Sequence, residues 1–305
     1  MADYKSLNLT EQPFIGESIS RFQFGEYFPP TGTNINNTVP IKINIEMTDS
    51  FFLPSKAYIQ VEGRLLKADG TSYANADVVT LTHNGIMHLF SRMEYDLSRQ
   101  NIEKHIFGFC VLYGFKHNNA IFRSAAAAAG KVNLTKVSLW MPYITPSDTE
   151  RLNLNSVIRE KVTISVAFYS RPCETTNPQQ TSKMTWKLGV KSDEKPRYII
   201  VGFQTNRNND QTQNASIFDH CNLTNMQVMI NNVRFPEADY ELSFPNQQFS
   251  RAHRDVSTFK ENFYGKFEII SNCNITPSDY KDLYPLMVFD LSKQSERLKP
   301  SVSDI

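Results

Sequence analysis

The sequence has little charge and little glycine. Only 21% of its 305 residues are charged, and 32 basic against 31 acidic side chains leave a net charge of +1. A surface that binds nucleic acid through phosphates normally carries a basic excess, so this balance disfavours sequence-specific nucleic-acid binding. The chain has only 12 glycines, too thinly spread for a phosphate-cradling loop.

Long hydrophobic runs and an export signal are also missing. No stretch approaches the roughly 18 apolar residues of a membrane helix. Met1 to Lys5 show no cationic start followed by an apolar core. We therefore expect no membrane partner. The cysteines are scattered, which is typical of reduced, buried thiols in an intracellular protein. They are Cys110, Cys173, Cys221 and Cys273.

Catalytic and metal-binding motifs are absent as well. The chain contains no G-x-G-x-x-G, Walker, C-x-x-C, H-E-x-x-H or G-x-S-x-G sequence. Asp219-His220-Cys221 places the residue types of a nucleophile triad side by side. In an extended segment, however, His220 would point away from the other two, which favours a structural role. We predict no enzyme, no catalytic residue, no cofactor and no metal ion.

Two further groups of polar residues could carry chemistry. His83 and His88 lie close in sequence, but a metal pair needs further ligands, and none is visible nearby. A second group combines basic and aromatic residues and could form a small cationic patch. A nucleic-acid site would need more Lys and Arg on one element, so a solvated or interface loop is favoured. This group comprises Arg251, His253 and Arg254 with Phe244, Phe249 and Phe259.

The sequence is rich in aromatic residues, at 12%, and in strand patterns. Apolar and polar residues alternate over 41–47, 57–62, 162–168 and 186–191, which predicts strands with one buried face. Segment 198–203 is apolar on both faces and predicts a strand between two layers. Polar connections between short strands indicate antiparallel β-sandwiches. The core faces should contain Ile43, Ile45, Val61, Ile164, Val166, Ile200 and Val228.

Helices should be short and few. The pentapeptide Ile-Thr-Pro-Ser-Asp occurs at 144–148 and at 275–279, and each copy predicts a helix with a threonine N-cap before proline. Two interpretations stay open, namely ordinary capping chemistry and tandem duplication of one sandwich. In either case we place a domain boundary near residue 150, between domains 1–150 and 151–305.

Several segments together resemble a known family. They are FFLPSKAYIQVEG (51–63), ADGT (68–71), GIMHLFS (85–91), HIFGF (105–109), YGFKH (113–117), KPRYIIVGFQTN (195–206), FDHCNL (218–223) and YPLMVFD (284–290). These stretches resemble, in the same order, the double jelly-roll major capsid proteins of Maverick/Polinton-type elements and adintovirus-like viruses. Capsid-like homologues in invertebrate genomes belong to the same kind.

The resemblance implies an all-β chain of two tandem antiparallel β-sandwiches, a double jelly roll, with a few short helices in loops. The C-terminal jelly roll would be incomplete. Three copies would form a pseudo-hexagonal capsomer of an icosahedral shell, with penton or minor capsid proteins as further partners. The protein would reside in the virion capsid and assemble inside the host cell, with the nucleus as a candidate compartment. The family supplies no catalytic residues that map onto this sequence.

The chain departs from the resemblance at three places. Extra strands and a loop are expected near 104/105 and 110/111, and further strands after Ile305. Either this is a shortened relative, or segments of a longer protein are missing from the sequence.

The connections 204–217 and 234–262 are too long for tight hairpins and should reach across subunits. The alternative function is a monomeric β-sandwich binding module, lectin-like or receptor-like, with a concave aromatic site.

Overall fold

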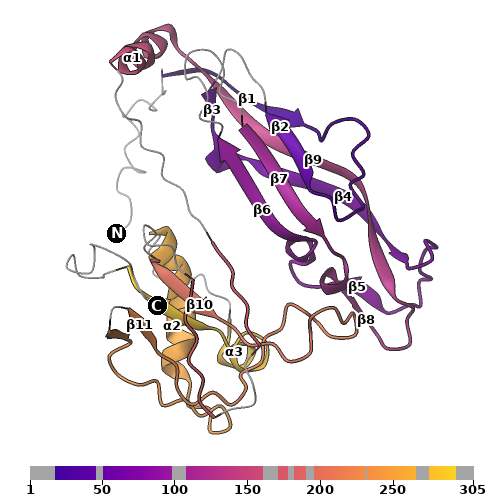
Figure 1. Ribbon diagram of the computed structural model, residues 1–305, viewed down its shortest axis with the longest axis vertical. Coiled ribbons are helices and arrows are strands. Elements are labelled where there is room, and N and C mark those ends of the chain that lie inside the picture. The colour runs from indigo at the N-terminus through magenta and orange to yellow at the C-terminus, as the bar shows by residue number, and fades with distance from the viewer. Residues whose placement is uncertain are drawn as a thin grey trace, which may run out of the picture. The chain divides into compact units, whose positions relative to one another are not determined.

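The structure is a computed structural model that describes residues 18–45, 51–97, 108–160, 171–177, 182–189, 196–230, 232–265 and 275–292. The chain divides into two compact units, residues 1–168 and 169–305 (Figure 1). The boundary expected near residue 150 falls within helix α1 (Asp148–Arg159). In the described part of the chain, no helix has the length and apolar character needed to cross a membrane.

The N-terminal unit contains two main antiparallel sheets. In the first, the long strand β9 (Gly130–Pro146) is central, with β1 (Ile19–Tyr27) on one side and β3 (Phe51–Phe52) and β4 (Tyr58–Lys67) on the other. The second sheet has the order β2 (Ile41–Ile45), β7 (Gly108–Phe115), β6 (Phe90–Leu97). The described part of this unit also contains α1 and five short elements, namely η2 (Pro54–Lys56), β5 (Val79–Leu81), η3 (Gly85–His88), η4 (Asn118–Ala120) and β8 (Ile121–Arg123).

Alternating side chains build the core of this unit. Along β2 the pattern is buried, exposed, buried, exposed, buried, so every second residue packs inward. Both sheets contribute to a single apolar cluster, which makes the unit a packed two-layer structure. Its buried members include Ile41, Ile43, Ile45, Leu112, Leu134, Leu139 and Met141.

The C-terminal unit combines short strands with helices. Strand β10 (Tyr198–Val201) pairs with β13 (Met287–Asp290), and β11 (Val228–Ile230) pairs with β12 (Val233–Phe235), both antiparallel. Helices α2 (Ser250–Tyr264) and α3 (Pro277–Asp282) lie in the same unit. The core is strongly aromatic. Its buried residues include Ile230, Tyr240, Phe244, Phe249, Ala252, Tyr280 and Phe289.

The two copies of the repeated pentapeptide adopt different structures. Thr276 caps α3 as predicted, because its hydroxyl accepts the Asp279 N–H at 3.1 Å in a capping box. In the first copy, Thr145 still pairs with Arg21 of β1, and the Ser147 hydroxyl accepts the Glu150 N–H at 3.4 Å. The predicted Thr145 cap is therefore wrong, and the shared sequence does not mark the same structural position twice.

The strand predictions have mixed outcomes. The strand predicted over 41–47 is confirmed by β2 for its described part, 41–45, and that over 57–62 is confirmed by β4. The segment 162–168 lies outside the described residues. Residues 186–189 of the predicted strand 186–191 have irregular structure, so that prediction is wrong over the described part.

The core predictions also divide. Ile43, Ile45 and Val228 are buried as predicted, and Val61 is half-buried. Ile200 is 49% exposed, because β10 buries only one face, with Ile199 and Val201 packed on the core. The prediction of a strand between two layers is therefore wrong. Ile164 and Val166 lie outside the described residues.

Two loop predictions need correction. Much of 234–262 is helix α2, whose Ala252 and Val256 pack on the core of their own unit. This stretch is therefore not an open loop, while its reach to another subunit stays a prediction. In the other connection, 204–217, the side chains of Gln211 and Ala215 are buried, so this loop is not open throughout.

The described cysteines are free thiols. Cys110, Cys173 and Cys221 have no disulfide partner, as predicted. Only Cys110 is buried, however, so the expectation of buried thiols is wrong for the other two. Burial raises the pKa of the Cys110 thiol to about 11. Cys273 lies outside the described residues.

Candidate functional site

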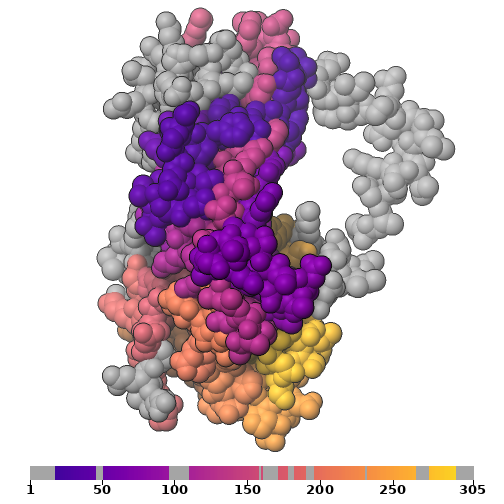
Figure 2. All heavy atoms as spheres, turned by 90° about the vertical axis from the view of Figure 1, so that its right-hand side faces the viewer, coloured from indigo at the N-terminus to yellow at the C-terminus, as the bar shows by residue number. Residues whose placement is uncertain are grey.

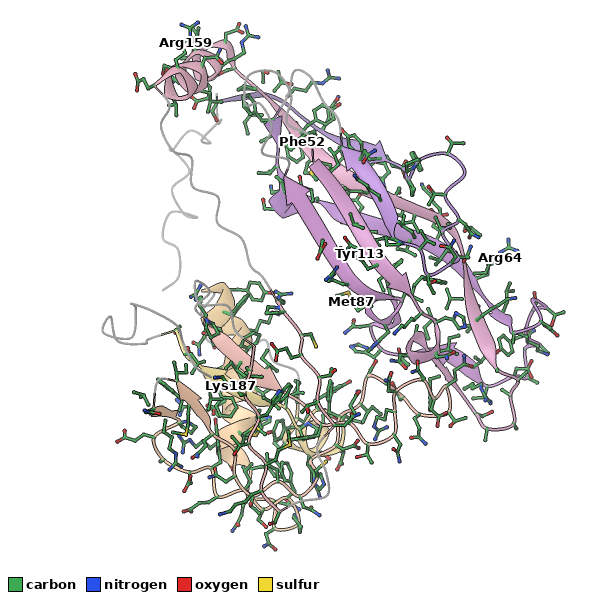
Figure 3. All side chains as sticks on the ribbon, in the orientation of Figure 1. Phe52, Arg64, Met87, Tyr113, Arg159 and Lys187 are labelled. Carbon is green, nitrogen blue, oxygen red and sulfur yellow. The ribbon has the colours of Figure 1, made fainter. Side chains whose placement is uncertain are left out.

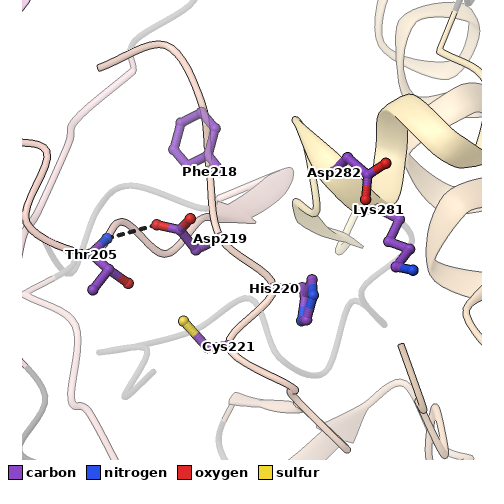
Figure 4. A pocket seen from close by; sticks show the side chains of 7 residues that line it. All are labelled: Thr205, Phe218, Asp219, His220, Cys221, Lys281 and Asp282. Carbon is purple, nitrogen blue, oxygen red and sulfur yellow. Dashed lines mark hydrogen bonds between the residues drawn. The ribbon is translucent and has the colours of Figure 1, made fainter. Parts of the chain in front are cut away.

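The Asp219-His220-Cys221 segment lines a pocket of about 350 Å³ (Figure 4). The segment is irregular and not the extended segment considered for it from the sequence, because Cys221 and Asn222 both have a φ of 48°. Its residues therefore do not alternate across a sheet face. The pocket is lined by Thr205, Phe218, Asp219, His220, Cys221, Lys281 and Asp282.

Asp219 is committed to a salt bridge. Arg207 donates from Nη2 to Oδ1 at 2.7 Å and from Nε to Oδ2 at 3.2 Å. The Thr205 N–H also donates to Oδ2 at 2.7 Å. The hydrogen bonds from Arg207, and then the Thr205 amide, hold the pKa of the Asp219 carboxyl below its usual range. The carboxylate thus joins 205–207 to the segment around 219 and does not orient a histidine.

His220 and Cys221 do not form a nucleophile pair. The His220 ring stacks on Phe244 with centroids 4.5 Å apart, and its Nδ1 accepts the Asn222 N–H at 3.0 Å. In a triad, the Nδ1–H of that ring would donate a hydrogen bond to the aspartate. Figure 4 shows the Cys221 sulfur and the His220 ring on different sides of the segment. Although Cys221 is exposed as a residue, partial desolvation of its thiol raises the pKa, which is the reverse of nucleophile activation.

Asp219→Asn should lower the free energy of unfolding by about 2 kcal/mol at pH 7, since hydrogen bonds to a charged group are lost. Because folding lowers the pKa of Asp219, its stabilisation is fully present above the unfolded-state pKa of about 3.9. It is lost as the pH falls through the lower folded-state pKa. The difference in the free energy of unfolding between variant and wild type should therefore become smaller below about pH 4. Urea denaturation at pH 7 and at pH 3 would measure this change.

The control is Asp282→Asn, at a carboxylate in the same pocket that accepts a long bond of 3.4 Å from Ser278. We expect it to change stability by less than about 0.5 kcal/mol. Equal effects of the two substitutions at pH 7 would contradict the role of the Arg207 contact.

The basic residues of the predicted cationic patch also make contacts within the fold. Arg251 donates to the carbonyls of Ala238 and Asp239 and lies 4.9 Å from the Tyr240 ring centre. The Nε2 atom of His253 is 2.9 Å from the Ile275 carbonyl oxygen. Arg251, His253 and Arg254 belong to α2, so the predicted loop is a helix.

The remaining candidates from the sequence are the aromatic residues of the predicted patch and the histidines of the predicted metal pair. Phe244 and Phe249 are buried in the core, and Phe259 packs edge-on against Tyr198, so they do not line a cationic patch. Burial lowers the pKa of His88. Among the residues that the structure describes, no cluster of three or more His, Cys, Asp or Glu could hold a metal ion.

A surface that the sequence did not predict lies on the outer face of the first sheet. Four aromatic rings from β1, β4 and β9 form a row, which we call the aromatic face. Phe22 and Phe24 have centroids 5.5 Å apart, Phe24 and Tyr58 5.8 Å, and Tyr58 and Trp140 6.1 Å. Such spacings are typical of favourable aromatic pairs. In the space-filling view, indigo N-terminal residues lie beside the pink residues of β9 (Figure 2).

The aromatic face is exposed and has a polar border. Phe22, Phe24 and Tyr58 are 44%, 40% and 51% exposed. The Trp140 Nε1 atom donates to Gln60 at 2.6 Å. Beyond it, Lys136 lies 2.7 Å from Glu26 and 3.9 Å from Glu62. An aromatic centre with a polar rim is the composition of a protein–protein interface.

Comparison with known proteins identifies one family. A family model described as a double jelly roll-like domain matches residues 102–305, about two thirds of the chain. No curated protein and no solved structure matches the chain.

Proposed function

Because the chain belongs to the double jelly roll-like domain family, we propose that it is a structural protein of the viral major capsid type that acts by self-assembly and catalyses no reaction. The fold is typical of viral capsid proteins. The antiparallel sheets and few helices agree with an all-β fold. The finer assignment, to capsid proteins of Maverick/Polinton and adintovirus-like elements, rests on the sequence resemblance.

The observation that carries the proposal, beside the family, is the aromatic face. Large aromatic side chains exposed on a rigid sheet are suited to bury area against another protein. A second copy is the partner that a shell protein requires. The net charge of +1 keeps long-range repulsion between copies weak.

The proposed assembly is a homotrimer. Two jelly rolls per subunit would give six similar towers per trimer, which can fill a six-fold lattice position in an icosahedral shell. Its permanent contacts should bury more than about 2,000 Å². Penton or minor capsid proteins would be further partners, and the assembled protein would reside in the virion capsid after assembly inside the host cell.

Light scattering at micromolar protein concentration should show assemblies with at least the mass of a trimer at both low and physiological salt, because apolar contacts are little affected by screening. Phe24→Glu should weaken this association by about 30-fold or more, since it places a charge at the centre of the aromatic face. The melting temperature should change little, because Phe24 is partly exposed.

Val78→Glu is the matched control, since Val78 is an exposed apolar residue of the same unit outside the aromatic face. It should leave the trimer intact. A wild-type protein that is strictly monomeric at both salt concentrations would contradict the capsid proposal and favour the binding module. A trimer insensitive to Phe24→Glu would assign association to another surface.

A further inference from the structure

Among the residues that the structure describes, strand β6 has no neighbour along one edge. It ends the order β2-β7-β6, and in the described part of the chain its only sheet neighbour is β7. All five residues from Ser91 to Tyr95 are exposed. Met87, in the turn just before the strand, is exposed as well (Figure 3). A strand edge of this kind presents unpaired backbone groups and readily pairs with another chain.

The order of the strands shows why this edge is open. An eight-stranded jelly roll has sheets of order 1-8-3-6 and 2-7-4-5. The orders β1-β9-β4 and β2-β7-β6 reproduce 1-8-3 and 2-7-4. Strand 5 would lie beside β6, and strand 6 would lie beside β4. Both would have to come between β6 and β7 in the chain, where there are only residues 98–107. Among the described residues, nothing continues either sheet on that side.

The two faces of β6 differ in chemistry. Met93 and Tyr95 stand opposite Leu112 and Cys110 of β7, on the face toward the core. They are nevertheless 61% and 39% exposed. On the other face, Arg92 lies 3.0 Å from Glu94. The Arg92 guanidinium also sits 4.4 Å from the centre of the Tyr113 ring.

We propose that β6 pairs edge to edge and antiparallel with β6 of a second copy, about a two-fold axis at Met93. In this register Arg92 stands opposite Glu94 of the second copy, and Glu94 opposite its Arg92. Each arginine then lies between two carboxylates, and the core-side faces of the two sheets stay aligned. The contact is isologous, as two-fold symmetry requires.

The charges select this register. Side chains that share a face must stay on that face, so the register can shift only by two residues in the pairing. A centre at Arg92 would place two arginines directly opposite one another, and a centre at Glu94 would place two glutamates opposite. Like charges directly opposite are destabilising, whereas opposite charges stabilise a pair. The strand also carries Asp96, which a centre at Glu94 would place opposite Arg92, but that centre makes two glutamates face one another. Only the centre at Met93 gives Arg92 an acidic partner without placing like charges opposite.

The contact is distinct from the aromatic face, which lies on the first sheet. The pairing itself does not depend on the proposed function, whereas its role as a link between trimers does. A two-fold contact cannot build a trimer, so in a shell it would join neighbouring trimers.

Charge exchange tests the pairing. In a Phe24→Glu background, which removes association through the aromatic face, sedimentation velocity should show a dimer at micromolar concentration. Arg92→Glu or Glu94→Arg alone should weaken this dimer at least tenfold. The double exchange Arg92→Glu with Glu94→Arg should restore it, because the pairing is complementary again. Melting temperatures of all variants check that the N-terminal unit stays folded.

Three results would overturn the inference: a monomer in the Phe24→Glu background, single variants that dimerise like their parent, or a double variant that is not restored. None of these results would contradict association through the aromatic face, because that proposal is tested by comparing Phe24→Glu with the wild type. The two proposals can therefore fail separately.

Cross-linking tests the register. Met93→Cys should give a 93–93 disulfide between copies under mild oxidation, identified by mass spectrometry of the linked peptides. Ser91→Cys is the matched control, because its two copies would be about 13 Å apart along the strands, beyond the reach of a disulfide. A 91–91 link, or no 93–93 link in a dimeric sample, would refute the register.

Discussion

Ile43→Asp is expected to destabilise the N-terminal unit by about 4 kcal/mol, because it forces an unpaired carboxylate into an apolar core. Ile43 is 0% exposed and lies in the middle of β2, opposite Cys110 of β7. Both neighbours on the same face, Ile41 and Ile45, are also buried. Urea denaturation followed by far-UV circular dichroism would measure the loss.

The neighbouring residue offers a matched control. Asn44 is exposed on the opposite face of the same strand, so Asn44→Asp adds the same carboxylate one residue away. It should change the free energy of unfolding by less than about 0.5 kcal/mol. If both variants unfold at the same urea concentration, the register of β2 is wrong.

Phe244→Ala should destabilise the C-terminal unit by about 3–5 kcal/mol, the usual cost of removing a buried aromatic ring. Phe244 is 1% exposed and stacks on His220 at 4.5 Å and on Phe249 at 5.5 Å. Tyr280 packs against the same ring. Hydrogen exchange would locate the loss, since amide protection should fall in this unit first.

Met229→Ala is the control for that experiment, because Met229 is an exposed apolar residue of β11 in the same unit. It should cost less than about 1 kcal/mol. A Phe244→Ala protein that keeps wild-type protection throughout 196–292 would show that the aromatic cluster does not hold this unit together.

The strands that could be predicted are those with one buried face. Alternation in 41–45 and 58–62 is strong because every second residue enters the core. Helix α2 was missed although Phe249, Ala252, Val256 and Phe259 follow helical spacing. Its N-cap residue is Phe249, which makes no side-chain cap, so the usual start signal is absent.

The aromatic face could not be predicted, for a different reason. Its rings come from β1, β4 and β9, which are distant in the sequence, and only the pairing register makes them neighbours. Strand β1 itself gives a weak signal, because its face opposite Phe22 and Phe24 carries Arg21, Gln23 and Gly25. Adjacency predicted a structural role for the Asp219 segment, but the contact with Arg207 could not be predicted, because Arg207 lies in another loop.

The central place of β9 governs the order in which the N-terminal unit can be made. Ile19 pairs with Pro146 and Lys67 with Gly130, so β1 and β4 gain their sheet partner only when 130–146 has left the ribosome. Until then both strands are unpaired on the nascent chain, and such edges are prone to aggregation. Closing contacts of this sequence separation is also slow. Synthesis of this protein should therefore depend on chaperone binding to residues 19–67 during translation.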